Sequence, residues 1–319
     1  MRRAARCCLA WAAIAAGGSL RGAPRRRLGS RRESYAVLLY GHHGHTAGAM
    51  VLGAVLRRAD PGRARTALVA NISDAARASL GGGGLWDLVE SDSFRRYGVD
   101  TEATDYASVW PGRKLDLWAL PYDTVVYMDL DIMLLESATL RAHLDGLFMS
   151  PLAAPGGGGP GSVVALKSRG DCLNSGTMVL RPHAATFEAL EATLNDAGRW
   201  KASCPGHDQK VLNAVFDGRW APLERWNYVK VTEHSCGRIP ETPDALHFFA
   251  DSAPWTLECR ACAAAGKLCS RRRHVDASHE GISDCMLPRM RNAQRAWWAE
   301  CAALDGCGAG VVRAPGAVC

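Results

Sequence analysis

Residues 122–131 read YDTVVYMDLD, a short apolar run that ends in two carboxylates, Asp129 and Asp131, separated by one leucine. The apolar part is rich in β-branched and aromatic residues, which predicts a buried strand. Because side chains alternate along a strand, both carboxylates can project to one side while Leu130 points into the core. This is the chain's only Asp-x-Asp triplet. Ligands of open α/β sheets bind beyond the carboxyl ends of the strands, and the acidic pair falls there.

Two hard oxygen donors placed together suit a divalent cation. Mg²⁺ or Mn²⁺ held by one or two carboxylates keeps coordination positions open for substrate phosphates. The alternative is structural, because short acidic pairs at strand ends also form turns and cap helices. The context of the triplet favours a metal–nucleotide site.

Strand-like and helix-like segments alternate on both sides of this run. The expected strands are 34–39, 66–70, 85–89, 124–128, 172–180 (after a short loop) and 245–249, and the expected helices are 47–58, 73–80, 114–120, 184–194, 206–216 and 289–304. This order predicts an α/β fold with a largely parallel sheet flanked by helices. Two glycine-rich stretches, 81–84 and 155–161, lack the Lys-Ser or Lys-Thr that a Walker phosphate loop requires, so we expect surface loops there.

The positive charge of the chain is concentrated at its N-terminus. Residues 1–33 hold nine arginines and one acid, a net +8, and because the whole chain carries +6 the remainder carries −2. The folded part is therefore not basic, and no nucleic-acid partner is expected.

The same N-terminal segment has the composition of a targeting leader. A positive stretch, 1–6, precedes an apolar stretch, 7–16, and the small residues 17–19, which predicts a secretory signal peptide. The apolar stretch is shorter than the about 20 residues of a membrane span. A short Golgi-type signal anchor and an Arg- and Ala-rich organelle transit peptide are the alternatives. The leader therefore predicts a protein of the secretory pathway, in the Golgi lumen or secreted, with an organelle as the alternative. No other stretch is long and apolar enough to cross a bilayer, so we expect the remainder to be soluble.

Cysteines crowd the C-terminal region. Seven of the twelve fall in the last 61 residues: Cys259, Cys262, Cys269, Cys285, Cys301, Cys307 and Cys319. Such density in an Ala- and Gly-rich segment predicts disulfides, with a zinc module built on the first four as the alternative. We therefore expect a leader at 1–33, a main domain at 34–258 and a Cys-rich extension at 259–319.

Five segments appear in a fixed order between Tyr35 and Trp255: KLDLW (114–118), VVYMDLD (125–131), NSG (174–176), HDQKVLN (207–213), and HFF (247–249) with PW (254–255). Together they resemble the glycosyltransferase family 8 domain, especially its glycogenin-like and galactinol-synthase-like members. The resemblance implies a nucleotide-sugar-binding fold of the GT-A type. It also implies retaining transfer of a hexose from a nucleoside diphosphate sugar, UDP-glucose or UDP-galactose in first place, to an acceptor that is a sugar, a polyol or a protein.

The resemblance also implies roles for individual residues. Asp129, Asp131 and His247 would bind Mn²⁺, with Mg²⁺ as the alternative, and an imidazole beside carboxylates agrees with Mn²⁺. Donor binding would fall to Lys114, Asn174, Ser175, Gln209 and Tyr40. Positive charge at the anomeric carbon favours a nearby carboxylate, and the candidates are Asp208 first and Asp171 second. Helix capping is the alternative role for Asp208.

The late motif of the family, His-x-x-Gly-x-x-Lys-Pro-Trp, is altered at two positions. Ala250 replaces the glycine and Ala253 replaces the lysine that would contact the donor diphosphate. A charge-assisted contact is worth about 1.5 to 3 kcal/mol, so donor binding would weaken unless another cation, Arg113 or Lys210, compensates. This departure keeps two other functions open: a nucleotide-sugar-binding protein with weak or no catalysis, and a Cys-rich extracellular interaction protein.

Overall fold

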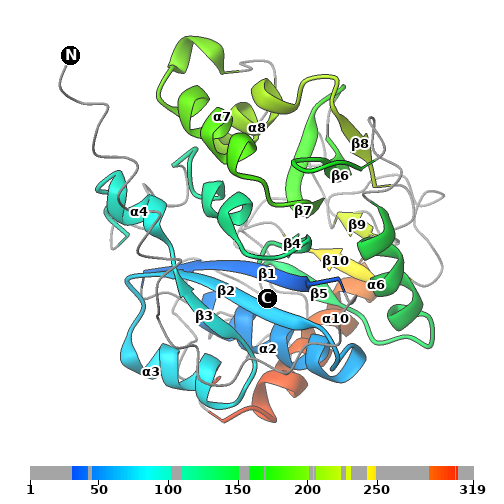
Figure 1. Ribbon diagram of the computed structural model, residues 1–319. Coiled ribbons are helices and arrows are strands. Elements are labelled where there is room, and N and C mark those ends of the chain that lie inside the picture. The colour runs from blue at the N-terminus through cyan, green and yellow to red at the C-terminus, as the bar shows by residue number, and fades with distance from the viewer. Residues whose placement is uncertain are drawn as a thin grey trace. The chain divides into compact units, whose positions relative to one another are not determined.

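The strand that precedes Asp129 lies in the middle of a seven-stranded sheet in the computed structural model (Figure 1). The structure describes residues 31–41, 45–101, 110–150, 158–168, 170–200, 204, 206–223, 228–230, 243–248, 287–305 and 307. Residues 32–319 make up one compact unit. The predicted leader lies outside the described residues apart from its last three.

The large sheet has the strand order β3-β2-β1-β4-β7-β6-β8. Its strands are β1 (Glu33–Tyr40), β2 (Ala64–Ala70), β3 (Asp87–Glu90), β4 (Thr124–Met128), β6 (Val163–Lys167), β7 (Leu173–Leu180) and β8 (Trp220–Pro222). Strands β3, β2, β1 and β4 pair in parallel, β7 is antiparallel to both β4 and β6, and β8 is parallel to β6. The carboxyl ends of the parallel strands therefore meet at one edge, where β4 delivers the acidic pair.

Helices cover both faces of this sheet. They are α2 (His45–Ala59), α3 (Asp74–Arg77) with the π turn η1 (Ala78–Gly82), α4 (Asp92–Arg96), the 3₁₀ turn η2 (Leu115–Ala119), α6 (Leu140–Met149), α7 (Ala184–Leu194), the 3₁₀ turn η4 (Ala197–Arg199), α8 (His207–Phe216) and α10 (Leu287–Ala302). Along β1 the odd-numbered residues from Tyr35 to Leu39 join one core cluster with α2, α6 and α10. The even-numbered residues from Ala36 to Tyr40 join a second cluster with η2, α7 and α8. A strand buried on both faces reads as a continuous apolar run, as β1 does.

Strand β7 contains an irregularity opposite β6. Ala165 pairs with Met178 and Leu166 pairs with Asn174, so residues 175–177 have no partner on β6 in this register. A bulge of this kind bends a strand and redirects its side chains. Here it brings the backbone of Gly176 to the end of β4, where its carbonyl accepts a 2.8 Å hydrogen bond from the Asp129 amide.

A second, three-stranded sheet has the order β5-β10-β9, built from β5 (Ile132–Leu134), β10 (Ala245–His247) and β9 (Tyr228–Lys230). Strand β10 is antiparallel to β5 and places His247 opposite Ile132. The chain thus leaves the large sheet at Asp129 and enters the small sheet at Ile132. The acidic pair occupies the crossing between the two sheets.

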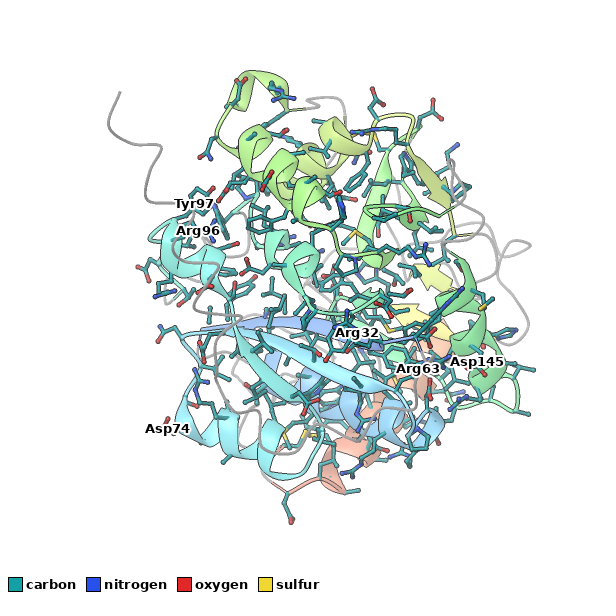
Figure 2. All side chains as sticks on the ribbon, viewed as in Figure 1. Arg32, Arg63, Asp74, Arg96, Tyr97 and Asp145 are labelled. Atoms are coloured by element: carbon teal, nitrogen blue, oxygen red, sulfur yellow. A yellow bond between two sulfur atoms is a disulfide. The ribbon has the colours of Figure 1, made fainter. Side chains whose placement is uncertain are left out.

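A buried charged cluster lies at the opposite, amino edge of the large sheet. The fully buried carboxylate of Asp60 accepts hydrogen bonds from the Tyr35 hydroxyl (2.7 Å), Arg63 and Arg141. Arg63 also pairs with Asp145 at 2.6 Å, and Figure 2 shows these two side chains meeting beside α6. We call Asp60, Tyr35, Arg63 and Arg141 the amino-edge cluster.

The expected fold class is confirmed, and most expected elements lie within two residues of their observed bounds. The short strands β5, β6, β8 and β9, the helices α4 and α6 and the turn η4 were not expected. The helix expected at 206–216 is α8, and the strand expected at 85–89 is shortened to β3.

The C-terminal region is not detached from the main core where the structure describes it. Helix α10 packs on α2, and Trp297, Trp298 and Cys301 are buried in the first core cluster. Cys301 and Cys307 form a disulfide, which confirms disulfide chemistry for this part of the extension. The four cysteines of the zinc alternative lie outside the described residues. Among the helices of the described residues, none is both long enough and apolar enough to span a membrane.

Candidate metal and donor site

Three side chains converge where the two sheets meet. One potential ligand atom each from Asp129, Asp131 and His247 lies within 4.8 Å of the others. The small sheet brings His247 to the acidic pair, and the Phe248 amide donates a 2.8 Å hydrogen bond to the Asp131 carbonyl. Leu130 points the other way and is buried in the first core cluster. The arrangement joins two segments that are more than one hundred residues apart.

The geometry of this triad fits a divalent cation. Asp131 Oδ1 lies 3.0 Å from His247 Nε2 yet is buried with no hydrogen-bond partner among the described residues. Neighbouring ligands of an octahedral ion with bonds of about 2.1 Å are themselves about 3.0 Å apart. The 3.0 Å separation of these two atoms is thus compatible both with an ion pair to a protonated imidazole and with neighbouring ligands of one divalent cation.

Gly176 leaves the space that an ion at this position needs. A Cβ atom on this residue would lie 3.0 Å from Asn174 Oδ1, 3.0 Å from His247 Cε1 and 3.4 Å from Asp129 Oδ2. Any larger residue would push against the triad. The bulge in β7 and the missing side chain thus act together to open the site.

Lys114 connects the triad to the rest of the site. Its side chain is 2% exposed, and its Nζ lies 3.0 Å from Asp129 Oδ1, 3.0 Å from Asp208 Oδ2 and 2.9 Å from the Ser175 carbonyl. Ser175 Oγ lies 3.0 Å from the same Nζ, so the three donors of the ammonium are shared among four acceptors. Asp129 Oδ1 also accepts a 2.5 Å hydrogen bond from the Tyr127 hydroxyl. The Oδ1 side of Asp129 is therefore held by protein, while Oδ2 faces Gly176.

Asp208 is the most enclosed acid of the site. Its carboxylate accepts from Ser175 Oγ at 2.6 Å and from Arg113 Nη2 at 2.7 Å, in addition to Lys114. Burial acts to raise the pKa of Asp208, but the charges of Lys114 and Arg113 outweigh burial and hold that pKa well below its ordinary range. Asp208 is therefore a carboxylate at neutral pH. The N-cap position of α8 belongs to Gly206, so capping is not the role that the structure shows for Asp208.

The two polar motifs of the site contact each other directly. Asn174 Oδ1 accepts a 3.0 Å hydrogen bond from the Gly176 amide, and Gln209 Oε1 accepts a 3.3 Å hydrogen bond from the Ser175 amide. Gly206, which precedes α8, has φ +79°, and a Cβ there would collide with Gln209 Nε2. These contacts bring Asn174, Ser175, Asp208 and Gln209 together in one cluster.

Tyr40 ends β1 close to the charged groups of the site. Its ring stacks on Phe94 with centroids 5.3 Å apart. Burial, joined by the charges of Asp129 and Asp208 and opposed by Arg113, raises the pKa of Tyr40 to about 12. Because these charged groups act on Tyr40, its side chain lies beside the site. Its hydroxyl is protonated at neutral pH.

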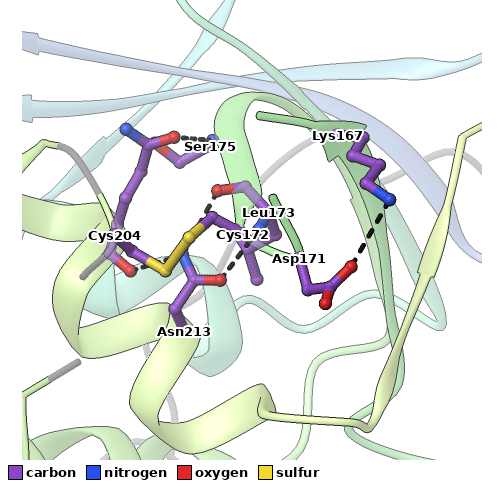
Figure 3. The surroundings of a disulfide bond; sticks show 8 residues. Lys167, Asp171, Cys172, Leu173, Ser175, Cys204 and Asn213 are labelled. Carbon is purple, nitrogen blue, oxygen red and sulfur yellow. Dashed lines mark hydrogen bonds and ion pairs between the residues drawn. A yellow bond between two sulfur atoms is a disulfide. The ribbon is translucent and has the colours of Figure 1, made fainter. Parts of the chain in front are cut away.

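The second catalytic candidate, Asp171, is not brought into this cluster. It lies in the turn between β6 and β7, its side chain is 97% exposed, and it faces Lys167 at 3.5 Å (Figure 3). An exposed turn residue of this kind was indistinguishable in the sequence from a site residue three positions before Asn174. Arg113, considered from sequence only as a replacement cation, is in the cluster, whereas Ala250 and Ala253 lie outside the described residues.

The sequence analysis did not identify two residues that support the site. Tyr127 shares the strand face of Asp129 and Asp131, and the same alternation that pairs the acids could have identified it. Asp116 is buried below the site and accepts hydrogen bonds from Ser91 Oγ (2.5 Å) and the Ser93 amide (2.9 Å). It thereby ties the segment that carries Lys114 to the start of α4.

Comparison with known proteins adds relatives and a fold. No family model matches the chain. UDP-glucuronate:xylan alpha-glucuronosyltransferase 1 of Arabidopsis thaliana is 29% identical over 202 residues, which are 63% of this chain and 27% of that protein. The putative UDP-glucuronate:xylan alpha-glucuronosyltransferase 3 of the same plant is 24% identical over 288 residues, 85% of this chain and 40% of that protein. This chain thus spans well under half the length of these relatives.

Solved structures identify the fold. The galactosyltransferase LgtC, in complex with donor and acceptor sugar analogs, superposes with a TM-score of 0.53 at 17% identity, over 72% of this chain and 92% of LgtC. An active-site mutant of LgtC gives a TM-score of 0.51 at 18% identity, over 70% of this chain and 90% of LgtC. The chain therefore has the GT-A glycosyltransferase fold, as the resemblance implied.

Proposed function

We propose that this protein is a glycosyltransferase that moves a hexose from a nucleoside diphosphate sugar to an acceptor, with retention at the anomeric carbon and in dependence on Mn²⁺ or, as the alternative, Mg²⁺. The observation that carries the proposal is the convergence of Asp129, Asp131 and His247 around the space left by Gly176. The GT-A fold and the names of the relatives support it.

A divalent cation held by Asp129, Asp131 and His247 would supply Lewis-acid stabilisation to the departing diphosphate, an effect of several kcal/mol. The side chains around the triad are arranged for this binding. Lys114 and the Tyr127 hydroxyl hold Asp129 Oδ1 in place, so the carboxylate cannot turn away. Orientation of ligands by neighbouring groups is the usual support of a metal site.

Asp208 supplies negative charge near the donor sugar in this proposal. Transfer with oxocarbenium character is favoured by a carboxylate close to the anomeric carbon. Because Asp208 is nearly inaccessible and its oxygens are held by Arg113, Lys114 and Ser175, we assign it electrostatic stabilisation and not covalent attack. The polar groups of Asn174, Ser175 and Gln209 would hold the sugar hydroxyls.

Arg113 is the cation that we propose in place of the missing family lysine. Its side chain is 20% exposed, and Asp208 is its single hydrogen-bonded partner among the described residues. A guanidinium offers five donors, more than Asp208 can take up, so in this proposal Arg113 also binds an anionic group of the donor. That group is the diphosphate of any nucleotide sugar, or the carboxylate of a uronic acid. The relatives' names include UDP-glucuronate as donor and xylan as acceptor, so both join UDP-glucose, UDP-galactose and other sugar, polyol or protein acceptors as candidates.

We further propose that the protein works in the secretory pathway. Two disulfides, Cys172–Cys204 and Cys301–Cys307, support this location because disulfides persist in oxidising compartments.

The decisive experiment measures UDP release by the full chain. The donors are UDP-glucose, UDP-galactose and UDP-glucuronate, each with Mn²⁺ and with EDTA, at first without acceptor. We expect slow, metal-dependent hydrolysis of at least one donor, which Asp131→Asn abolishes. Asp123→Asn is the matched control, because Asp123 sits before the opposite end of β4, is 43% exposed and pairs with Arg32. It should keep full activity.

Two results would contradict the proposal. Binding of UDP and Mn²⁺ by calorimetry without turnover of any donor would make this a nucleotide-sugar-binding protein. Equal turnover in EDTA would exclude the metal from the reaction. Retention is tested separately by NMR, since an α-linked donor must release an α-configured sugar first.

A further inference from the structure

The polar residues of the donor site come from two segments that a disulfide joins (Figure 3). Cys172 precedes Asn174 and Ser175 on β7, and Cys204 precedes Asp208 and Gln209 on α8. The bridge links positions 32 residues apart and brings their Cα atoms to 5.6 Å. Both cysteines are buried. The bridge therefore lies at the base of the site, and each arm leads within a few residues to a donor-binding group.

A second connection holds α8 to β7 one turn further along. The buried Asn213 side chain accepts from the Leu173 amide at 2.8 Å and donates to the Leu173 carbonyl at 3.2 Å. It also donates to the Gln209 carbonyl at 2.7 Å. Asn213 thus fixes the middle of α8. It does not fix the first residues of the helix, which carry Asp208.

The start of α8 has little local support of its own. Its N-cap is Gly206, which provides no capping side chain, and in the described structure no side chain caps this end. Asp208 lies in the first turn, but its carboxylate is directed to Arg113, Lys114 and Ser175. Uncapped helix ends fray, and glycine adds conformational freedom. This end of α8 is therefore held by the polar contacts of Asp208 and Gln209 and by the short chain that leads back to Cys204.

We propose that the Cys172–Cys204 bridge is a positioning element of the donor site. It holds the segment entering α8 against β7, so that Asp208 and Gln209 meet Ser175, and it thereby sets affinity for the sugar part of the donor. The inference rests on the proposed function of this site.

The bridge should affect the sugar part of the donor more than the nucleotide. The metal triad comes from β4 and β10, which the bridge does not touch. Apparent affinity falls in proportion to the fraction of molecules in the competent conformation. If opening the bridge leaves about one tenth competent, the KM for a UDP-sugar rises about tenfold, with kcat changed less than KM. Affinity for Mn²⁺-UDP, which lacks the sugar, should stay within about twofold.

The test uses two variants of the full chain, each of which removes one cysteine of the Cys172–Cys204 bridge. Cys204→Ser opens the bridge at the site, and Cys172→Ala opens it from the β7 side. Cys301→Ser is the matched control, because it opens the bridge Cys301–Cys307, which lies in the first core cluster beside α10. For each folded protein, checked by circular dichroism, the measurements are the donor KM and kcat and the calorimetric Kd of Mn²⁺-UDP and of the intact UDP-sugar. We expect the KM and the UDP-sugar Kd to rise together in the first two variants, with no change in the control.

Three results would overturn the inference. Equal losses for UDP and UDP-sugar would show general destabilisation, and an unchanged UDP-sugar Kd in Cys204→Ser would show that the bridge does not position the site. Alkylation of both Cys172 and Cys204 in the unreduced native protein, read by mass spectrometry, would show that the bridge does not form. If neither variant folds, mild reduction of the folded wild-type protein, with the opened cysteines identified by alkylation, provides the same comparison. Absence of turnover in the wild type would count against the proposed function alone, because the calorimetric comparison needs no catalysis.

Discussion

Two buried carboxylates, at opposite edges of the same sheet, are each held by two cations and a hydroxyl. In the amino-edge cluster, Asp60 is bound by Arg63, Arg141 and Tyr35. In the site, Asp208 is bound by Arg113, Lys114 and Ser175.

Both oxygens are occupied in Asp60 and in Asp208, so the difference lies in the other acids of each cluster. At the amino edge, Arg63 continues to Glu33 and Asp145, and both Asp60 oxygens are occupied. In the site, Asp131 Oδ1 lacks a hydrogen-bond partner among the described residues. Asp129, at 27% exposure, keeps one oxygen toward Gly176. Since buried polar groups are normally satisfied, a network left incomplete at a strand end is prepared for a ligand, whereas a complete network serves the fold.

The largest expected effect is on catalysis, in Asp131→Asn. Loss of the charge should lower kcat/KM by about 10³-fold or more, since several kcal/mol of transition-state stabilisation is removed. The free energy of unfolding, from urea denaturation, should fall by less than about 1 kcal/mol, because the partner of this side chain in the described structure is a single imidazole, His247 at 3.0 Å. A larger loss of stability in Asp131→Asn would show that the site acid supports the fold as Asp60 does.

The converse is expected for Asp60→Asn. Removing one member of a buried ion network leaves charges without a partner and costs about 3 to 5 kcal/mol of unfolding free energy. Activity per folded molecule should stay within about twofold. Asp92→Asn is the control, an exposed acid paired with Arg95 that should cost less than about 1 kcal/mol. Loss of activity in folded Asp60→Asn would break the comparison.

Gly176→Ala tests the space beside the triad. The new methyl group would lie 3.0 Å from His247 Cε1, so His247 must shift and the affinity for Mn²⁺ should fall about 10- to 100-fold. Gly146→Ala in α6, where a Cβ meets nothing within 4 Å of the described structure, should bind Mn²⁺ normally and gain stability. Calorimetry with Mn²⁺ alone measures both variants. Normal Mn²⁺ affinity in Gly176→Ala would separate this glycine from the metal site.

Arg113→Gln sharpens the comparison at the level of the donor. Loss of one charge-assisted contact should lower kcat/KM about tenfold for every donor. An additional loss for UDP-glucuronate relative to UDP-glucose would assign the sugar carboxylate to Arg113. Arg95→Gln is the control, since its side chain is 84% exposed on α4. An unaltered donor profile at full activity would leave Arg113 a purely structural partner of Asp208.

The smallest effect concerns acid stability. Because the pKa of Asp208 is lowered in the folded protein, this group stabilises the fold fully above its unfolded pKa of about 3.9, and the contribution is lost as pH falls toward the folded value. In Asp208→Asn, which starts from a lower stability at pH 7, the unfolding free energy should therefore fall less steeply between pH 5 and pH 3. Urea titrations across this range measure both slopes. Parallel slopes would mean that the Asp208 pKa is not lowered.

The sequence was sufficient where the pattern is local. Strand β1, strand β4 and helix α7 follow from uninterrupted apolar runs or helical periodicity, and the observed bounds agree closely. The three-residue strands β5 and β9 carry too few residues for a pattern, whereas the strand expected at 245–249 was found as the shorter β10. Strands β5 and β9 exist because distant segments pair, as His247 does with Ile132. Sequence could propose His247 for the triad only through resemblance to a family.

The sequence also could not show which polar side chains are buried or which cysteines pair. Asp171 and Asp208 look alike in the sequence, yet one is exposed in a turn and the other is buried between two cations. Lys114 would pass for a surface lysine without the contacts that enclose it. The partner of Cys172 could not be read from spacing, because cysteine connectivity is set by the fold.

Helix α10 has a consequence for biosynthesis. It covers α2, and Cys307 Sγ lies 4.0 Å from the Ala47 carbonyl although the two residues are 260 positions apart. At about 5 to 20 residues per second, the ribosome needs roughly 10 to 50 s to make the intervening chain. During that interval the apolar face of α2 that later receives Trp297 stays uncovered. The first β-α-β unit to emerge is therefore the last to be completed, because its core lacks α10 until the end of synthesis.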